Sequence, residues 1–325
     1  MSKRLLNLAQ LSAVGLTGYL LGHNSNHHCK ENDSISLATS SRILKCLPGL
    51  PVFGTVSAAV PYTEGGNSKD RISEIMKYGF PGLDNVRSYD DFVLSYDRRT
   101  RVPHWVFEHL TKDHIKKNDA VDRSKCDFKP DDSIHIFFRS QNSDYKGSGF
   151  DRGHMAAAGN HRLAQRHVEQ TFYLTNMAPQ VGQGFNRDAW NRLEKHVRKL
   201  TKVYENVFCC TGPLYLPRKE SDGKSYVKYQ VIGANTVAVP THFFKVVVGE
   251  SPDGTLHMES YVMPNQRIPD ETPVSSFMPR LVSEYWVSKS RAIANSGAIW
   301  RAKANWLRRS WASLEHGNTS SRPTY

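Results

Sequence analysis

Gly147-Ser-Gly-Phe-Asp-Arg-Gly-His154 is the stretch from which the fold and the chemistry of this chain are best inferred. A neutral imidazole, with an ordinary pKa of about 6.5, accepts a proton from water at neutral pH, so His154 is a candidate general base. Arg152 can hold a phosphate oxygen, and Gly153 lets the backbone approach a bulky substrate. Taken alone, a histidine beside charged residues is more often a surface or structural residue.

An amphipathic helix is predicted directly after Asn186, which is placed as its N-cap. One face of this helix is an apolar stripe and the face opposite to it is polar. The plainest interpretation of the polar face is a row of solvated charges. The apolar stripe consists of Trp190, Leu193, Val197, Leu200 and Tyr204, and the polar face consists of Arg187, Asn191, Glu194, Arg198 and Lys202.

A metal site has to be sought without the usual motifs, because the chain has no HExxH sequence and no pair of cysteines at ligand spacing. These absences disfavour zinc. Mg²⁺ keeps most of its water and needs only one or two protein oxygens, so the amide oxygen of Asn186 is a candidate ligand. Glu194 could accept hydrogen bonds from water around the ion, or it could pair with Arg198 on a solvated face.

Short runs rich in β-branched and aromatic residues recur beyond Ile72 and are separated by turn residues. They predict an α+β fold, a mostly antiparallel sheet with inserted helices. The expected strands are 92–96, 105–108, 134–138, 172–176, 207–211, 226–232, 237–248 and 257–262.

The charge of the chain favours a polyanionic partner, because the formal net charge is +12. Nucleic acid and an acidic membrane surface both fit. The five cysteines form no CxxC pair, which indicates free or buried thiols rather than a disulfide framework. If Cys209 and Cys210 lie on a strand, one should face the core and the other should face outward.

Four regions are expected along the chain. Residues 1–45 carry early basic residues and an apolar stretch, which suits a mitochondrial targeting or anchor segment; a membrane span is marginal, and a secretory signal is disfavoured. Residues 46–70 suit a linker, 71–288 the folded domain, and 289–325 a basic tail with interleaved tryptophans. Three interpretations of that tail stay open: binding to anionic lipid, stacking on nucleic acid, or packing on the domain.

Residues from about 75 to 264 resemble the mitochondrial endonuclease G family, within the DNA/RNA non-specific endonucleases of ββα-metal fold. Several motifs match in the same order along the chain, so the resemblance covers most of the domain. The matching stretches are 78–83, 93–101, Gly147-Ser-Gly-Phe-Asp-Arg-Gly-His154, Thr171-Phe-Tyr-Leu-Thr-Asn-Met-Ala-Pro-Gln180, Ala189-Trp-Asn-Arg-Leu-Glu194 and Lys228-Tyr-Gln-Val-Ile-Gly233.

The resemblance implies cleavage of DNA and RNA with a general base at His154 and a Mg²⁺ or Mn²⁺ ligand at Asn186. It also implies supporting roles for Arg152, Asn176, Glu194 and Arg198. Beyond the site, it implies a ββα-metal motif, a homodimer and a location in the mitochondrial intermembrane space.

Two departures from the family pattern bear on these expectations. The family commonly has Leu-Asn-Gln around the metal-binding asparagine, whereas this chain has Phe185-Asn-Arg187. Arg187 could therefore contact phosphate or repel the ion. The basic tail replaces the usual closing segment and offers a membrane contact, as the N-terminal segment does. The rival hypotheses are a catalytically weak nucleic-acid- or membrane-binding member of the same fold, and a different phosphoesterase such as a phosphatase or phospholipase.

Overall fold

The computed structural model describes residues 68–279 of the chain. The predictions for 1–45, for most of 46–70 and for the tail 289–325 therefore lie outside the described residues. Within 68–279, no helix is both long enough and apolar enough to cross a membrane.

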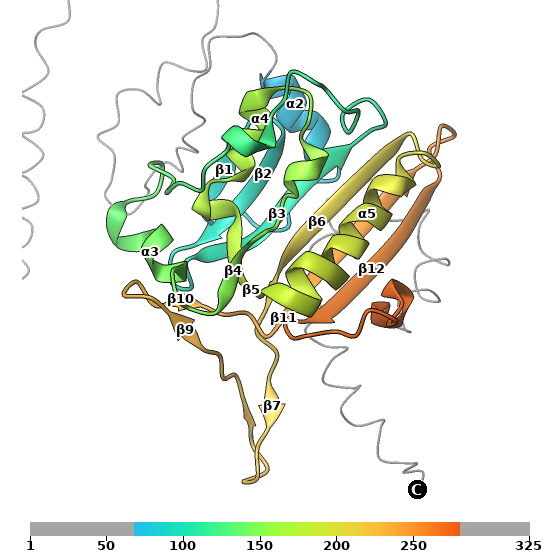
Figure 1. Cartoon of the computed structure of the whole chain (residues 1–325). Helices are drawn as coiled ribbons and strands as arrows, with labels where there is room; N and C mark the ends of the chain where they lie inside the picture. The colour runs from blue at the N-terminus through green and yellow to red at the C-terminus, as the bar shows by residue number, and fades with distance from the viewer. Residues whose placement is uncertain (1–67, 280–325) are drawn as a thin grey trace, which may run out of the picture. The chain divides into compact units, whose positions relative to one another are not determined.

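The central element is a six-stranded antiparallel sheet in the order β1-β2-β3-β6-β11-β12 (Figure 1). It confirms the expected α+β class. Its strands are β1 (Val86–Ser88), β2 (Phe92–Asp97), β3 (Val102–Leu110), β6 (Asn206–Leu214), β11 (His242–Glu250) and β12 (Leu256–Pro264).

Side chains point alternately to the two faces of the sheet along each strand, and each face carries a buried apolar cluster. Leu94 and Cys209 belong to the larger apolar cluster, whereas their neighbours Val93 and Cys210 belong to a second cluster on the other face. The expectation that one of the two cysteines would face outward was therefore wrong. Cys126, Cys209 and Cys210, the cysteines within the described range, are free thiols as expected.

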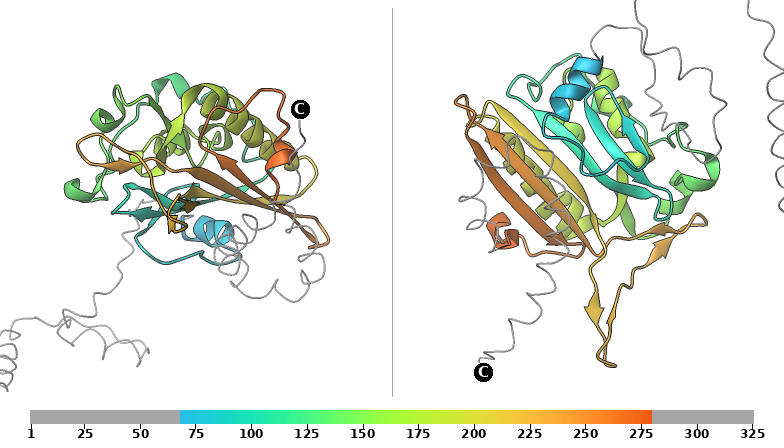
Figure 2. Two further views of the ribbon diagram at one scale, coloured as in Figure 1. Left: turned by 90° about the horizontal axis from the view of Figure 1, so that it is seen from below. Right: turned by 180° about the vertical axis from the view of Figure 1, so that it is seen from behind.

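The two faces are covered by different parts of the chain. Helix α2 (Ser68–Ile75) lies against one face, and the segment between β3 and β6 covers the other, as the edge-on and rear views show (Figure 2). Within that segment β4 and β5 pair as an antiparallel hairpin and lead into helix α5, which together form a ββα unit. The segment comprises η2 (Arg123–Lys125), η3 (Ile136–Phe138), α3 (Asn142–Tyr145), β4 (Phe150–His154), η4 (Ala158–Asn160), α4 (Gln165–Thr171), η5 (Leu174–Asn176), β5 (Met177–Val181), η6 (Gly182–Trp190) and α5 (Asn191–Leu200).

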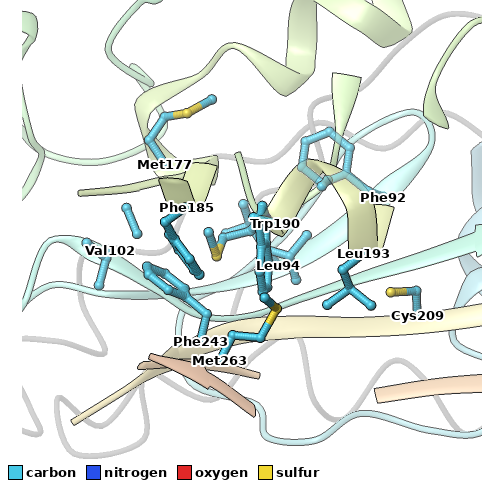
Figure 3. Close-up of a cluster of buried hydrophobic side chains, with 14 of the residues drawn as sticks. Phe92, Leu94, Val102, Met177, Phe185, Trp190, Leu193, Cys209, Phe243 and Met263 are labelled. Atoms are coloured by element: carbon cyan, nitrogen blue, oxygen red, sulfur yellow. The ribbon is translucent and has the colours of Figure 1, made fainter. Parts of the chain in front are cut away.

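The apolar stripe predicted after Asn186 packs on the sheet. Trp190, Leu193 and Val197 are at most 1% exposed, and Leu200 and Tyr204 pack against the same cluster. In Figure 3 the side chains of Trp190 and Leu193 point toward the sheet, where Phe243 and Cys209 lie. Burial of this stripe fixes the rotation of the helix, and so directs its polar face away from the sheet.

Two predicted strands were wrong. Segments 134–138 and 172–176 contain the short helical turns η3 and η5 instead, and Phe137 is 73% exposed, so its apolar run does not signal a sheet. The expected strand at 226–232 is divided, and 237–248 contains β10 and most of β11. The remaining elements are β7 (Arg218–Lys219), β8 (Ser225–Tyr226), β9 (Val231–Ile232), β10 (Val237–Ala238) and η7 (Val274–Phe277).

Candidate active site

A cleft of about 1040 Å³ opens on the ββα unit, and all of its lining residues lie between Arg123 and Arg198. Seven lysine and arginine side chains line it against two carboxylates, those of Asp151 and Glu194, so the cleft suits a polyanion. Five of the six side chains predicted for the site line this cleft: His154, Arg152, Asn186, Glu194 and Arg198.

His154 is the last residue of β4, where it lies opposite Met177 of β5. Its ring packs edge-on against Phe172, with 4.8 Å between centroids, and lies 5.6 Å from the ring of Phe128. Burial, and then the positive charge of Arg123, lower the pKa of His154 to about 3. The imidazole is therefore neutral at physiological pH, and its Nε2 atom has no hydrogen-bond partner among the described residues.

Arg152 is held in place from two sides. Its Nη1 donates a 2.7 Å hydrogen bond to Oδ1 of Asn142 on α3, and its guanidinium lies 4.1 Å from the centroid of the Phe128 ring. The ring therefore stabilises the charge of Arg152 by a cation–π contact, while the remaining N–H donors of the guanidinium stay available to a phosphate.

Asp151 joins the hairpin to the start of the helical segment. Its carboxylate accepts a 2.9 Å hydrogen bond from Nδ2 of Asn186. It also accepts two hydrogen bonds from Arg187, from Nε at 2.9 Å and from Nη2 at 2.7 Å. Hydrogen bonding to Arg187 lowers the pKa of Asp151, which keeps the carboxylate ionised. The charge of Arg187 is therefore balanced by a partner, which weakens the expectation that it repels a cation on Asn186.

Asn186 does not cap the helix, so that prediction was wrong. Gln183 and Gly184 have non-helical dihedrals inside η6, and the regular turn begins at Phe185. Gly184 has a φ of 82°, and its backbone N–H donates to Asp188 at 2.6 Å, which closes the first turn. Asn186 thus lies one residue inside the helix, with its side chain turned to Asp151 on β4.

The donors around Asn186 fit a hard divalent cation. The Nδ2 group of Asn186 donates to Asp151, and the carbonyl oxygen Oδ1 accepts no hydrogen bond from residues 68–279. This oxygen is therefore available as a metal ligand. In the same range, no three His, Cys, Asp or Glu side chains cluster as a metal cage. A single amide oxygen beside bound water is a donor set that Mg²⁺ accepts, whereas structural zinc needs more nitrogen or sulfur ligands.

Glu194 lies in the cleft, and of its two proposed roles the pairing is not formed, since no salt bridge joins it to Arg198 among the described side chains. Burial raises the pKa of Glu194, and the nearby charges of Lys245 and Arg198 oppose that shift. Arg198 instead donates from Nη1 to Oδ1 of Asn160 at 3.0 Å. Glu194 is thus available to solvent molecules or ligands in the cleft.

A buried polar network stands behind Arg198. Nδ2 of Asn160 donates to Oε1 of Glu108 at 2.8 Å, and His161 bridges that same carboxylate to Asp91, at 3.0 and 2.8 Å. His161 is fully buried, and its hydrogen bonds to the two carboxylates raise its pKa to about 9 despite the opposing effect of burial. An imidazolium ion thus lies between two carboxylates beneath the cleft.

Asn176 lies beneath the cleft rather than in it. Fully buried, it accepts from the backbone N–H of Ala156 at 2.8 Å and donates to the carbonyls of Ala156 and Thr171. It therefore positions the chain that leaves His154. Gly153 also faces protein rather than substrate, because a Cβ atom there would lie far inside van der Waals contact with the buried Gln180 side chain.

Three contributors were missed by the sequence analysis: Asp151, Asn142 and Phe128. Asp151 was quoted only as a neighbour of Arg152, although its place in the hairpin opposite Gln180 brings it to the helix start. The alternation of side chains along the strand that ends at His154 would not have shown that Asp151 binds Asn186. Asn142 begins the four-residue helix α3 and Phe128 lies on an irregular segment, and in neither is there enough regular structure for residue spacing to predict direction.

Comparison of the chain with known proteins agrees with a cleft that binds a polyanion. Residues 71–283 match the family model of the DNA/RNA non-specific endonucleases. The chain therefore belongs to the DNA/RNA non-specific endonucleases, enzymes that depend on a metal ion and act on nucleic acid. Within that family it is a member of the endonuclease G group.

Individual relatives support this assignment. The mitochondrial endonuclease G of Caenorhabditis elegans is 60% identical over 207 residues, which cover 64% of this chain and 67% of the relative. The human protein of the same name is 54% identical over 205 residues, covering 63% and 68%. A crystal structure of an EndoG/EndoGI complex matches with 73% identity and a TM-score of 0.64, covering 69% of this chain and 89% of that one.

Proposed function

We propose that this endonuclease hydrolyses phosphodiester bonds with His154 as general base and with Asn186 as the protein ligand of a divalent cation. The observation that carries the proposal is the hydrogen bond from Asn186 Nδ2 to Asp151, because it orients the amide oxygen in the cleft that also contains His154. Neutral His154 takes a proton from the attacking water. Arg152 and Arg198 bind non-bridging oxygens of the phosphate and hold it for in-line attack.

The cation is proposed to be Mg²⁺ or Mn²⁺, because a lone amide oxygen suits hard ions that keep most of their water. When bound, such an ion stabilises the negative charge that develops on the phosphoryl and leaving oxygens. Glu194 accepts hydrogen bonds from water in the cleft. The bond from phosphorus to the 3′ oxygen breaks as the bond to water forms, and the departing oxygen takes up a proton from solvent water, which leaves 5′-phosphate and 3′-hydroxyl ends.

Both DNA and RNA are proposed as substrates. The lysine and arginine side chains that line the cleft are suited to bind backbone phosphate, which the two polymers share. The relatives are named mitochondrial, which supports a mitochondrial location, and we extend it to the intermembrane space. A homodimer and a membrane contact through the N-terminal segment or the C-terminal tail complete the proposal.

The test is nicking of a supercoiled plasmid by the wild-type protein, His154→Ala and Asn186→Ala, with His104→Ala as a control. His104 is an exposed histidine on β3, outside the cleft lining. We expect the two site variants to lose about 100-fold or more in rate and the control to keep its rate. Nearly full cleavage by His154→Ala, with unchanged folding and metal concentration, would remove its assignment as the base.

Metal binding needs a readout of its own. Electron paramagnetic resonance of Mn²⁺ titrated with protein counts the free ion directly, without any turnover. Asn186→Ala should bind Mn²⁺ at least about 10-fold more weakly than the wild-type protein, whereas His104→Ala should not differ. Equal affinity for all three proteins would place the ion on other residues.

A further inference from the structure

A cluster of exposed aromatic and basic side chains lies outside the cleft. Short helix η3 presents Phe137 and Phe138 at 73% and 42% exposed, and the ring of His135 lies 5.1 Å from that of Phe137. Aromatic side chains that are exposed next to one another often mark a surface that binds another molecule. We call this cluster the basic aromatic patch, and it comprises Arg98, Arg99, Arg101, His135, Phe137 and Phe138.

The arginines of the patch come from the turn between β2 and β3. Arg98 lies over the Phe138 ring, with 5.6 Å from Cζ to the centroid. Arg101 fixes the patch, because its Nη2 donates to the carbonyl oxygen of Phe137 at 3.1 Å and its Nη1 lies 3.4 Å from Oγ1 of Thr236. The rings and the cations are thus parts of one local arrangement.

The charge of the patch is not neutralised within the described part of the chain. None of the arginines at 98, 99 and 101 makes a salt bridge there, whereas the nearby Arg139 pairs with Asp132 at 2.5 Å. Unpaired guanidinium groups beside exposed rings are the combination that binds single-stranded nucleic acid, in which phosphates meet cations and bases stack on rings. A neutral apolar partner would leave these charges uncompensated.

The patch is close enough to the cleft to act on the same strand. Phe138 is four residues before Asn142, which lines the cleft, so their Cα atoms are at most about 14 Å apart. One nucleotide of a stacked strand advances about 3.4 Å, and that gap corresponds to about four nucleotides. Lys146, an exposed cation of the cleft wall, directly follows α3.

We infer that the basic aromatic patch is a second binding site for the nucleic-acid substrate, at which an unpaired base stacks on Phe137 and backbone phosphate binds Arg98 and Arg99. This inference rests on the proposed function, because the same strand has to occupy the cleft. It predicts that single-stranded substrates long enough to span both sites are preferred over short ones.

The first test measures binding of fluorescein-labelled single-stranded DNA by fluorescence anisotropy, in buffer with a chelator so that no cleavage occurs. Phe137→Ala and Arg98→Ala should weaken binding of a 12-nucleotide strand about 5-fold each, and binding of a trinucleotide should not change. The matched controls are Val203→Ala, which removes another side chain that is 69% exposed, and Lys112→Ala, beyond the opposite end of β3. Equal Kd values for the 12-nucleotide strand with all proteins would overturn the inference.

A double-mutant cycle locates the stacked base. Removing one base at a time from the 12-nucleotide strand should weaken binding by the wild-type protein at one position and have no such effect at that position with Phe137→Ala. Independent losses at every position would overturn the stacking contact. Sedimentation of Phe137→Ala adds a further outcome, since dissociation of a wild-type oligomer would show that the patch binds a second copy instead.

The outcomes separate this inference from the proposed function. Val203→Ala lies outside both the cleft and the patch, so its plasmid nicking should match that of the wild-type protein. If the wild-type protein cleaves with its metal and the 12-nucleotide strand binds all variants equally, only the patch is refuted. If His154→Ala cleaves normally while Phe137→Ala binds weakly, only the assignment of the base is refuted.

Discussion

The carboxylate of Asp151 on β4 accepts a 2.9 Å hydrogen bond from the amide nitrogen of Asn186 on η6. Strand β5 leads into the helix along the chain, and this hydrogen bond joins the other strand of the hairpin, β4, to the same helical segment. The hydrogen bond selects one of the two orientations of the amide, and thereby presents oxygen rather than nitrogen to the cleft. The same carboxylate holds Arg187, so one side chain orients a candidate ligand and balances its positive neighbour.

Asp151→Ala should weaken metal binding without removing a ligand. The Asn186 amide would be free to rotate, and Arg187 would lose its anionic partner, so we expect a 10- to 100-fold rise, as an approximate range, in the Mn²⁺ concentration that gives half-maximal cleavage. Arg187→Gln retains the hydrogen bond between Asp151 and Asn186, and should change that concentration by no more than about 3-fold. A metal dependence of Asp151→Ala equal to that of the wild-type protein would show that the amide needs no such support.

Gly153→Ala should destabilise the fold by about 1–3 kcal/mol, because the added methyl group overlaps the fully buried side chain of Gln180. Thermal or urea unfolding measures the loss. Combining Gly153→Ala with Gln180→Ala should recover part of it, since the second change removes the overlapping atoms. Gly82→Ala is the control, because its Cβ would lie 3.7 Å from the nearest atom, an ordinary contact.

His161 should make stability depend on pH above neutrality. Its pKa is about 9 in the folded protein, against 6.5 for an unperturbed histidine, so the stabilisation is complete below about pH 6.5 and is lost as pH rises through about 9. His161→Asn should therefore be destabilised relative to the wild-type protein by about 3 kcal/mol more at pH 6 than at pH 10. Urea unfolding at a series of pH values measures this difference. A difference independent of pH would mean that His161 contributes shape rather than charge.

The pH profile of cleavage should lack an ionisation near pH 6.5. Because burial and Arg123 lower the pKa of His154 to about 3, the free enzyme carries a neutral imidazole throughout the physiological range. The acid limb of kcat/KM, which reports the base of the free enzyme, should therefore lie below pH 5. Arg123→Met should move that limb to higher pH, whereas Lys195→Met, which removes a different cleft cation, should leave it in place. An acid limb centred at pH 6.5 in the wild-type protein would contradict this environment for His154.

The sequence predicted most reliably the features that depend on periodicity. The stripe through Trp190, Leu193 and Val197 identified the helix and the face that packs on the sheet, because burial follows the helical repeat directly. The long strands β2, β3, β6 and β12 were found because runs of β-branched and aromatic residues between turns are typical of buried strands. The helix start was misplaced, because Gly184 and the bond to Asp188 set it and neither is periodic.

The site was predictable by residue type but not by arrangement. His154, Asn186, Glu194 and Arg198 were expected in the site and line one cleft, although the helix pattern alone suggested that the face with Glu194 and Arg198 was solvated. Whether a polar face meets water or a second element depends on distant contacts, here the hairpin of β4 and β5. Asn176 shows the converse, since a residue in a matching motif is fully buried and holds the backbone.

The ββα unit is inserted between β3 and β6, which are neighbours in the sheet with Val106 opposite Thr211. Every residue that lines the cleft belongs to that insertion. Its two ends are thus fastened side by side only after strands distant in sequence have paired, a slow kind of contact in folding. A newly made or extended chain therefore holds no assembled nuclease, and cutting activity arises only as folding is completed.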